Sequence, residues 1–191
     1  MNIKLKLFLF SILISVSNLS FATDTDGDGV PDSEWLQIGG DIDGEQAGDR
    51  SGRVSLSADG SVLAIGADGN DGNGDYSGHV RIFQWGGSSW IQRGADIDGE
   101  NSTDFSGKSV SLSADGSLVA IGSPNNENNG AFAGHVRLFA WNGASWIQRG
   151  DNINGEPYDK SGFAVSLSAD GSTVAIVAEQ DFGMGSAYTG S

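Results

Sequence analysis

A threefold tandem repeat constrains this chain more than any other feature of its sequence. The copies begin at Trp35, Trp90 and Trp146, so the repeated unit is about 55 residues long. The heptapeptide Ser-Leu-Ser-Ala-Asp-Gly-Ser recurs in each copy, at residues 55–61, 111–117 and 166–172. A single unit of this size cannot bury its apolar residues alone, so tandem copies predict supersecondary units that stack on one another.

Each unit has the pattern of four short strands. In the second copy, with the start of the third, the expected strands span residues 109–113, 118–121, 136–141 and 146–149. Asp-Gly at 115–116 favours a two-residue hairpin turn, because both positions require φ > 0. Outside the N-terminal leader no segment shows a helical apolar period. The sequence therefore predicts an all-β fold of repeated four-stranded antiparallel blades, arranged as a partial, about three-blade, β-propeller-like array.

The N-terminus has the pattern of a signal peptide. Lys4 and Lys6 precede a short apolar run, and small residues precede a cleavage point after Ala22. The alternative is an uncleaved anchor helix. We expect a signal peptide at 1–22, an acidic Asp-rich loop at 23–34, and three repeats at 35–89, 90–145 and 146–191, the last incomplete. We therefore expect a secreted, extracellular or cell-envelope protein without a membrane span in its mature chain.

The composition argues against several classes of partner and site. The formal net charge is −15, and a field of this sign repels phosphate backbones and anionic lipids. The chain has no cysteine, which excludes disulfides and thiolate metal sites. Stability must then come from packing or from metal binding.

Short segments of the repeats resemble the FG-GAP family, whose repeats form the blades of integrin-α-type propellers. They are Phe105-Ser106-Gly107, Ser109-Val110-Ser111 and Ile121-Gly122-Ser123-Pro124, with related segments at 65–68, 163–165 and 176–179. The resemblance covers residues 35–191 and implies a propeller of about seven blades. Because this chain holds about three units, the interpretations are a fragment of a longer propeller protein, an open stack, or closure by oligomerisation. Open blade edges favour self-association.

An aspartate-rich loop precedes the repeats and is the clearest chemical motif. Its calcium-type ligands are Asp24, Asp26, Asp28, the carbonyl of Val30, and Asp32. They stand at positions 1, 3, 5, 7 and 9 of a calcium loop, and the segment resembles thrombospondin type 3 and EF-hand-like loops. Trp35 occupies position 12, where a bidentate acid would complete the ligand set. The expected cofactor is calcium, and the alternative is a flexible acidic linker.

Other acidic segments are weaker candidates. Asp71, Asn73 and Asp75 could form part of a second calcium loop, although the matching loop at 125–129 lacks aspartate. The motif Asp-Ile-Asp-Gly-Glu at 41–45 recurs at 96–100 and becomes Asn-Ile-Asn-Gly-Glu at 152–156. Because the third copy loses the charge, a turn motif is favoured over a metal site.

No catalytic motif is apparent. His79 and His135 occupy equivalent places in two repeats, which favours a structural role in a strand over catalysis. We therefore expect no enzyme but a secreted or cell-surface repeat module for binding or adhesion, stabilised by calcium, with an extracellular protein or glycan as partner. The alternatives are a purely structural surface spacer, or the N-terminal part of a larger secreted propeller protein or hydrolase.

Overall fold

The computed structural model describes residues 8–10 and 35–179, so the aspartate loop at 24–32 and the predicted cleavage point lie outside the described residues. The described segments are all-β and contain no helix. Strands within each sheet pair antiparallel. The predicted all-β, antiparallel class is thus confirmed. Among the described residues, no helix is present that could cross a membrane.

Two sheets have the same five-stranded plan. The first orders β3 (Ser51–Leu56), β4 (Val62–Ala67), β5 (His79–Trp85) and β6 (Trp90–Gln92), with β7 (Ile97–Asp98) also paired to β5. The second orders β8 (Ser109–Leu112), β9 (Leu118–Ser123), β10 (His135–Trp141) and β11 (Trp146–Gln148), with β12 (Ile153–Asn154) also paired to β10. The tryptophan strands that begin the second and third sequence repeats, β6 and β11, therefore complete the sheet of the preceding repeat.

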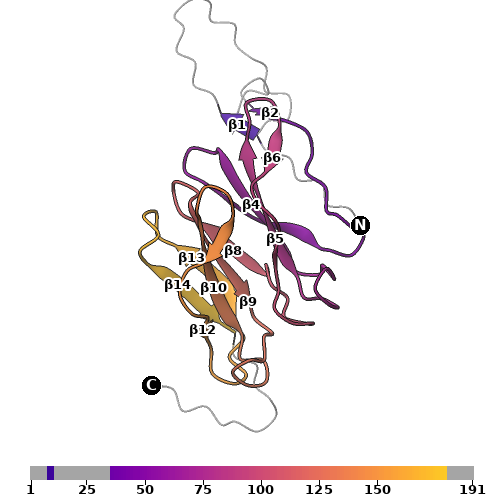
Figure 1. Ribbon diagram of the computed structural model, residues 1–191, viewed down its shortest axis with the longest axis vertical. Helices are drawn as coiled ribbons and strands as arrows, with labels where there is room; N and C mark the ends of the chain where they lie inside the picture. The colour runs from indigo at the N-terminus through magenta and orange to yellow at the C-terminus, as the bar shows by residue number, and fades with distance from the viewer. Residues whose placement is uncertain (1–7, 11–34, 180–191) are drawn as a thin grey trace, which may run out of the picture.

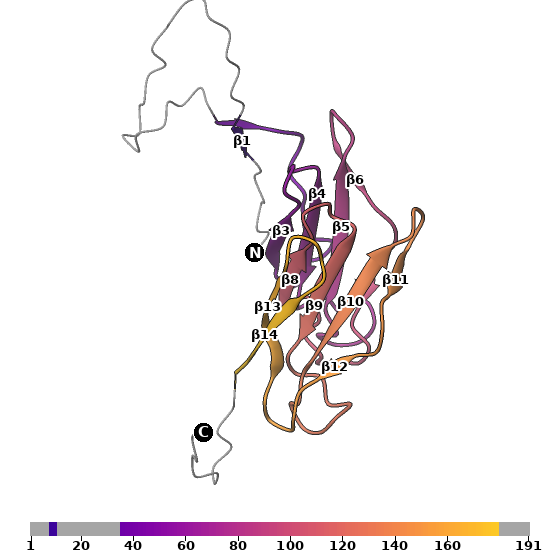
Figure 2. The ribbon, with the colours of Figure 1, turned by 90° about the vertical axis from the view of Figure 1, so that its left-hand side faces the viewer.

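Two smaller sheets complete the described structure. β13 (Ser161–Leu167) pairs with β14 (Val174–Ala178), and β1 (Phe8–Phe10) pairs with β2 (Trp35–Gln37). The two five-stranded sheets and the β13–β14 sheet, together the three main sheets, follow one another across the molecule in chain order (Figure 1). Their first strands, β3, β8 and β13, lie together along one side, whereas β6 and β11 lie on the other (Figure 2).

The main core lies between neighbouring sheets. It consists of Val62, Ala64, Val80, Ile82, Ile97, Leu112, Val119, Ile121 and Phe139. β4 is buried along its whole length, and β9 is buried from its second residue onward. Burial of both faces explains why these strands are continuously apolar instead of alternating.

The repeated heptapeptide is explained by hydrogen bonds within and between units. In the first copy, the Ser57 hydroxyl accepts from the Val62 amide at 2.9 Å and donates to Asp59 at 2.7 Å, which fixes the β3–β4 hairpin. The Ser55 hydroxyl instead accepts from the Leu112 amide of the next unit, at 2.9 Å. Ser111 makes the same bond to Leu167 one unit later. These bonds satisfy amides at the edges of β8 and β13, which would otherwise be unpaired.

Candidate metal centre

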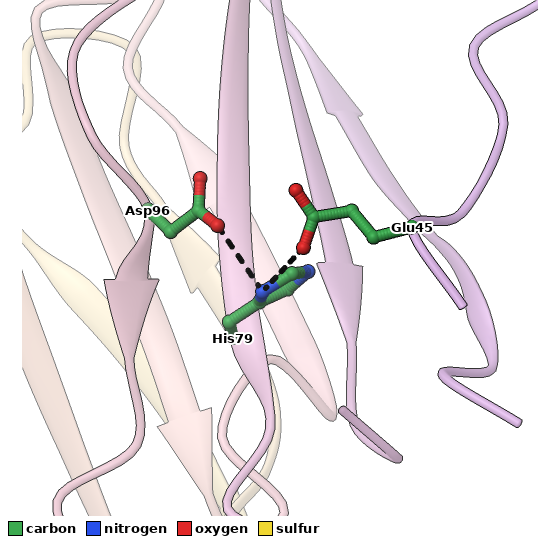
Figure 3. Close-up of side chains that lie close together, drawn as sticks. All are labelled: Glu45, His79 and Asp96. Atoms are coloured by element: carbon green, nitrogen blue, oxygen red, sulfur yellow. Dashed lines mark ion pairs between the residues drawn. The ribbon is translucent and has the colours of Figure 1, made fainter. Parts of the chain in front are cut away.

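One cluster in the described part of the chain gathers three side chains able to bind a metal: Glu45, His79 and Asp96 (Figure 3). A donor atom of each lies within 4.8 Å of the others. His79 begins β5, Glu45 lies in the loop before β3, and Asp96 directly precedes β7. The pairing of β7 with the start of β5 holds Asp96 beside His79.

His79 is the buried member of the cluster. Its side chain is 2% exposed, and its Nδ1 lies 3.6 Å from Asp96 Oδ2 and 3.9 Å from Glu45 Oε2. Within the described residues neither ring nitrogen makes a hydrogen bond, and Nε2 is buried without a partner. Glu45 is exposed and Asp96 is half-buried, so the cluster is accessible from solvent.

Each carboxylate has one oxygen held by the protein and the other directed at His79. The Gln92 side-chain amide donates to Asp96 Oδ1 at 2.6 Å, which leaves Oδ2 facing the imidazole. The Arg81 guanidinium lies 3.8 Å from Glu45 Oε1, which leaves Oε2 facing the imidazole. Arg81 is itself fixed, because it donates to the backbone carbonyl of Asp43 at 2.7 Å. The cluster is therefore oriented by its neighbours, as metal ligands usually are.

The second unit contains the same arrangement with two differences. His135 and Glu100 correspond to His79 and Glu45, but Asn152 replaces Asp96. The Asn152 amide nitrogen lies 3.3 Å from His135 Nδ1 and donates to Glu100 Oε2 at 3.1 Å. Asn128 also donates to Glu100 Oε2 at 3.1 Å, and Gly72 stands at the corresponding position of the first unit. The second cluster is thus closed by N–H donors.

The first cluster lacks both of these donors. Asp96 places an oxygen where Asn152 places an N–H group, so two carboxylate oxygens and an imidazole nitrogen face one another. The Arg81 guanidinium lies beside Glu45, and a bound cation between the imidazole and the two carboxylates would balance the negative charge that remains. Zinc bonds of about 2.1 Å in tetrahedral geometry put ligand atoms roughly 3.4 Å apart. His79 Nδ1 lies 3.6 and 3.9 Å from the two carboxylate oxygens, which is close to that spacing, and all three donor atoms lie within 4.8 Å of one another.

In the second unit, burial keeps His135 neutral. Burial lowers the pKa of His135 below its ordinary value of 6.5, and the nearby Arg137 lowers it further, whereas Glu100 and Asp104 oppose the shift. The neutral imidazole suits the contact with the Asn152 amide, because Nδ1 then accepts that N–H.

The His135 shift predicts a pH dependence of stability. The unfolded chain takes up a proton near pH 6.5 and the folded chain does so only at lower pH. The contribution of a neutral His135 to the free energy of unfolding is therefore complete above pH 6.5. It is lost as pH falls below 6.5, by at most about 1.4 kcal/mol per pH unit. Urea unfolding between pH 7.5 and 5.5 measures this slope. The slope should be smaller in His135→Gln, and equal slopes in the two proteins would contradict the assignment.

The weaker calcium candidates predicted from sequence take part in loop contacts. The Asp71 carboxylate accepts from the Tyr76 amide at 2.7 Å. The Asn73 side-chain amide donates to the Gly99 carbonyl, also at 2.7 Å, and the Asp75 carbonyl accepts from the Thr103 amide. The Asp71 bond closes the loop on itself, the other two tie the loop to the next unit, and calcium binding there stays a prediction.

The members of the cluster belong to separate motifs in the sequence. The sequence pattern predicts a structural strand role for His79 and a turn for the acidic motif that contains Asp96. The sequence did contain a useful indication, since the change from Asp96 to Asn152 distinguishes two otherwise matching units. Its meaning depends on the pairing of β7 with β5, which brings that position beside a histidine.

Comparisons with known proteins identify no family. No family model matches the chain, and no curated protein matches it. Among solved structures, it is similar to hydrazine synthase of Kuenenia stuttgartiensis, with 17% sequence identity and a TM-score of 0.48. The match covers 77% of this chain and 41% of the other, so this chain spans less than half of that protein's length.

Proposed function

We propose that this chain is a non-catalytic extracellular binding module in which a divalent cation, held by Glu45, His79 and Asp96, fixes the loops at one end of the sheets. The observation that carries the proposal is the replacement of the Asn152 amide by the Asp96 carboxylate. In the second unit the amide links histidine and glutamate directly. In the first unit a cation would take over that linking role.

The donor set favours zinc or a similar transition metal. One imidazole nitrogen and two carboxylate oxygens suit Zn²⁺ or Mn²⁺. Calcium prefers six to eight oxygen ligands, which matches the aspartate loop at 24–32 better than this cluster. Calcium binding at Asp24–Asp32 is therefore a separate part of the proposal, independent of His79.

The segments that supply the three ligands also carry an aromatic surface cluster of Arg50, Tyr76 and Phe105. The Arg50 guanidinium carbon lies 5.3 Å from the Tyr76 ring centroid and 6.0 Å from that of Phe105, and the two rings are 5.6 Å apart. All three residues have positive φ, and Tyr76 is 42% exposed. Exposed aromatic and arginine side chains are frequent anchors in interfaces. This cluster supports a binding module over a passive spacer, with a protein or glycan as the partner.

Export from the cell and a propeller-like arrangement of the repeats belong to the same proposal. The leader and the absence of cysteine are compatible with export, and the stacked repeat supports a propeller-like arrangement of blades. Self-association through open blade edges is a further part of it. The alternatives of a structural spacer or of one portion of a larger secreted protein differ from it in predicting no cation dependence at the cluster.

Metal titration of chelator-treated protein tests the proposal. We expect Zn²⁺ to bind with one-to-one stoichiometry in calorimetry. At a zinc concentration of 100 times Kd, the stabilisation should be about 2.7 kcal/mol, which corresponds to a rise in Tm of roughly 5–10 °C. Glu45→Gln should weaken zinc binding at least tenfold, while calcium binding to the aspartate loop should be unchanged.

Glu127→Gln is the matched control, since Glu127 is also exposed and lies outside the cluster. It should bind zinc like the unmodified chain. The proposal is wrong if zinc gives neither heat nor a rise in Tm, or if both glutamine variants bind zinc equally well.

A further inference from the structure

A second candidate site lies away from the metal cluster, across the first strands of the three main sheets. It is a hollow of about 500 Å³ whose walls come from β3, β8 and β13. These strands lie together along one side of the molecule (Figure 2). The volume is within the range of about 300–1,000 Å³ that is typical of small-molecule sites.

The hollow is basic although the protein is strongly acidic. The chain has a formal net charge of −15, yet the described residues that line the hollow include no acid, and they include both Arg53 and Lys108. Lys108 is balanced, because its Nζ lies 3.1 Å from the carboxylate of the buried Asp68. Within the described residues no carboxylate lies within ion-pair distance of Arg53, which is exposed. With respect to the described residues, the hollow therefore presents one uncompensated positive charge.

The rest of the lining is largely apolar. Val54, Val110 and Val165 hold the same position in the three repeats and form a row across the hollow. Phe163 adds an aromatic ring that is 38% exposed, and Val54 is 48% exposed. Apolar surface beside a single cation matches a ligand that has an apolar body and one negative charge.

The repeats differ at this place although their scaffold is copied. The heptapeptide that starts directly after each valine is identical in all three units. The residue directly before the valine is Arg53, Ser109 or Ala164. Only the first copy thus has a guanidinium at this position. The other two copies have a hydroxyl or a methyl group there, so the fold does not require an arginine. This difference is expected of a site placed on a repeated scaffold.

We infer that the hollow binds a small organic monocarboxylate. Its carboxylate pairs with the Arg53 guanidinium, whose planar group can donate two parallel hydrogen bonds. Its apolar body contacts the valine row and Phe163. A single charge is favoured because one cation is unbalanced and because the net charge of the protein repels multiply charged ligands more strongly. The inference does not depend on metal binding at His79.

Phenylacetate is a suitable probe for the full chain. We expect saturable binding in calorimetry or NMR titration. The neutral analogue phenylacetamide and the dianionic phenyl phosphate should each bind at least tenfold more weakly. If phenylacetamide binds as well as phenylacetate, or if phenyl phosphate binds more tightly, the proposed ligand class is wrong.

Arg53→Gln locates the binding. It should weaken phenylacetate binding at least tenfold, because the charge-assisted pair is lost. Arg149→Gln removes the same charge from another exposed arginine outside the hollow and should leave binding unchanged. Equal affinities in the two variants would overturn the inference. Both side chains are exposed, so neither change should alter the thermal melt appreciably.

Discussion

Replacing Gly122 with alanine is expected to destabilise the chain by about 3 kcal/mol, because the second and third sheets meet at this residue. Gly122 lies in β9, and an added Cβ would overlap the carbonyl oxygen of Gly162 and the hydroxyl of Ser109. The obstacle is partly backbone, so no side-chain rotation can relieve it. The sheets would have to separate and lose part of their buried contact. Urea unfolding, followed by tryptophan fluorescence, measures the loss.

Gly40→Ala is the matched control. Gly40 is exposed, and an added Cβ there meets no atom within 4 Å. Its effect should be close to zero or slightly stabilising, because alanine reduces the freedom of the unfolded chain. Gly122→Ala and Gly40→Ala with equally small effects would show that the sheets do not meet as closely as the structure describes.

The same contact distinguishes the third unit from the first two. Gly66 and Gly122 admit the backbone of the following unit, but Val177 stands at the equivalent place in β14 and is 52% exposed. A further unit, from this chain or from a second copy, could not approach β14 as β13 approaches β9. Self-association through this face, which open blade edges would favour, therefore needs a different packing from that inside the array.

The strands were predictable because their determinants are local. The expected segments 118–121 and 136–141 correspond to β9 (118–123) and β10 (135–141), since apolar runs bounded by turn residues specify strands directly. The two-residue strands β7 and β12 were not predicted. Each makes only two residue pairs with β5 or β10, which is too short to produce a periodic pattern, and their Asp/Asn-Gly sequence is typical of a turn.

The candidate metal centre was not predictable in the same way. Glu45, His79 and Asp96 are far apart in sequence and meet only after the first sheet has formed and β7 has paired with β5. Sequence spacing reveals ligands that lie within one loop, as at 24–32, because such ligands converge through local backbone geometry. The sequence showed the Asp96/Asn152 difference, but only the structure places both residues against histidines.

The Asp96/Asn152 difference predicts that exchanging the two residue types changes the stability of metal-free protein in opposite directions in the two units. Asp96→Asn should give the first cluster the histidine–amide–glutamate link of the second, with the new amide donating to Glu45, while Gly72 still lacks the donor that Asn128 supplies. In metal-free protein the change should be neutral or stabilising, because it supplies one of the two missing N–H donors. Zinc should then raise Tm much less than in the unmodified chain, because one charged ligand is gone.

Asn152→Asp should have the reverse effect. It removes the hydrogen bond to Glu100 and the contact with buried His135, and it places a second carboxylate beside Glu100. A loss of about 1–3 kcal/mol is expected in metal-free protein, with part of it recovered on adding zinc. Thermal melts of both variants with and without zinc measure the stability change that each substitution causes in metal-free protein and the rise in Tm that zinc causes in each variant. If Asp96→Asn destabilised the metal-free chain as much as Asn152→Asp does, an amide N–H would not stabilise the first cluster in place of a cation. The metal assignment would then be wrong.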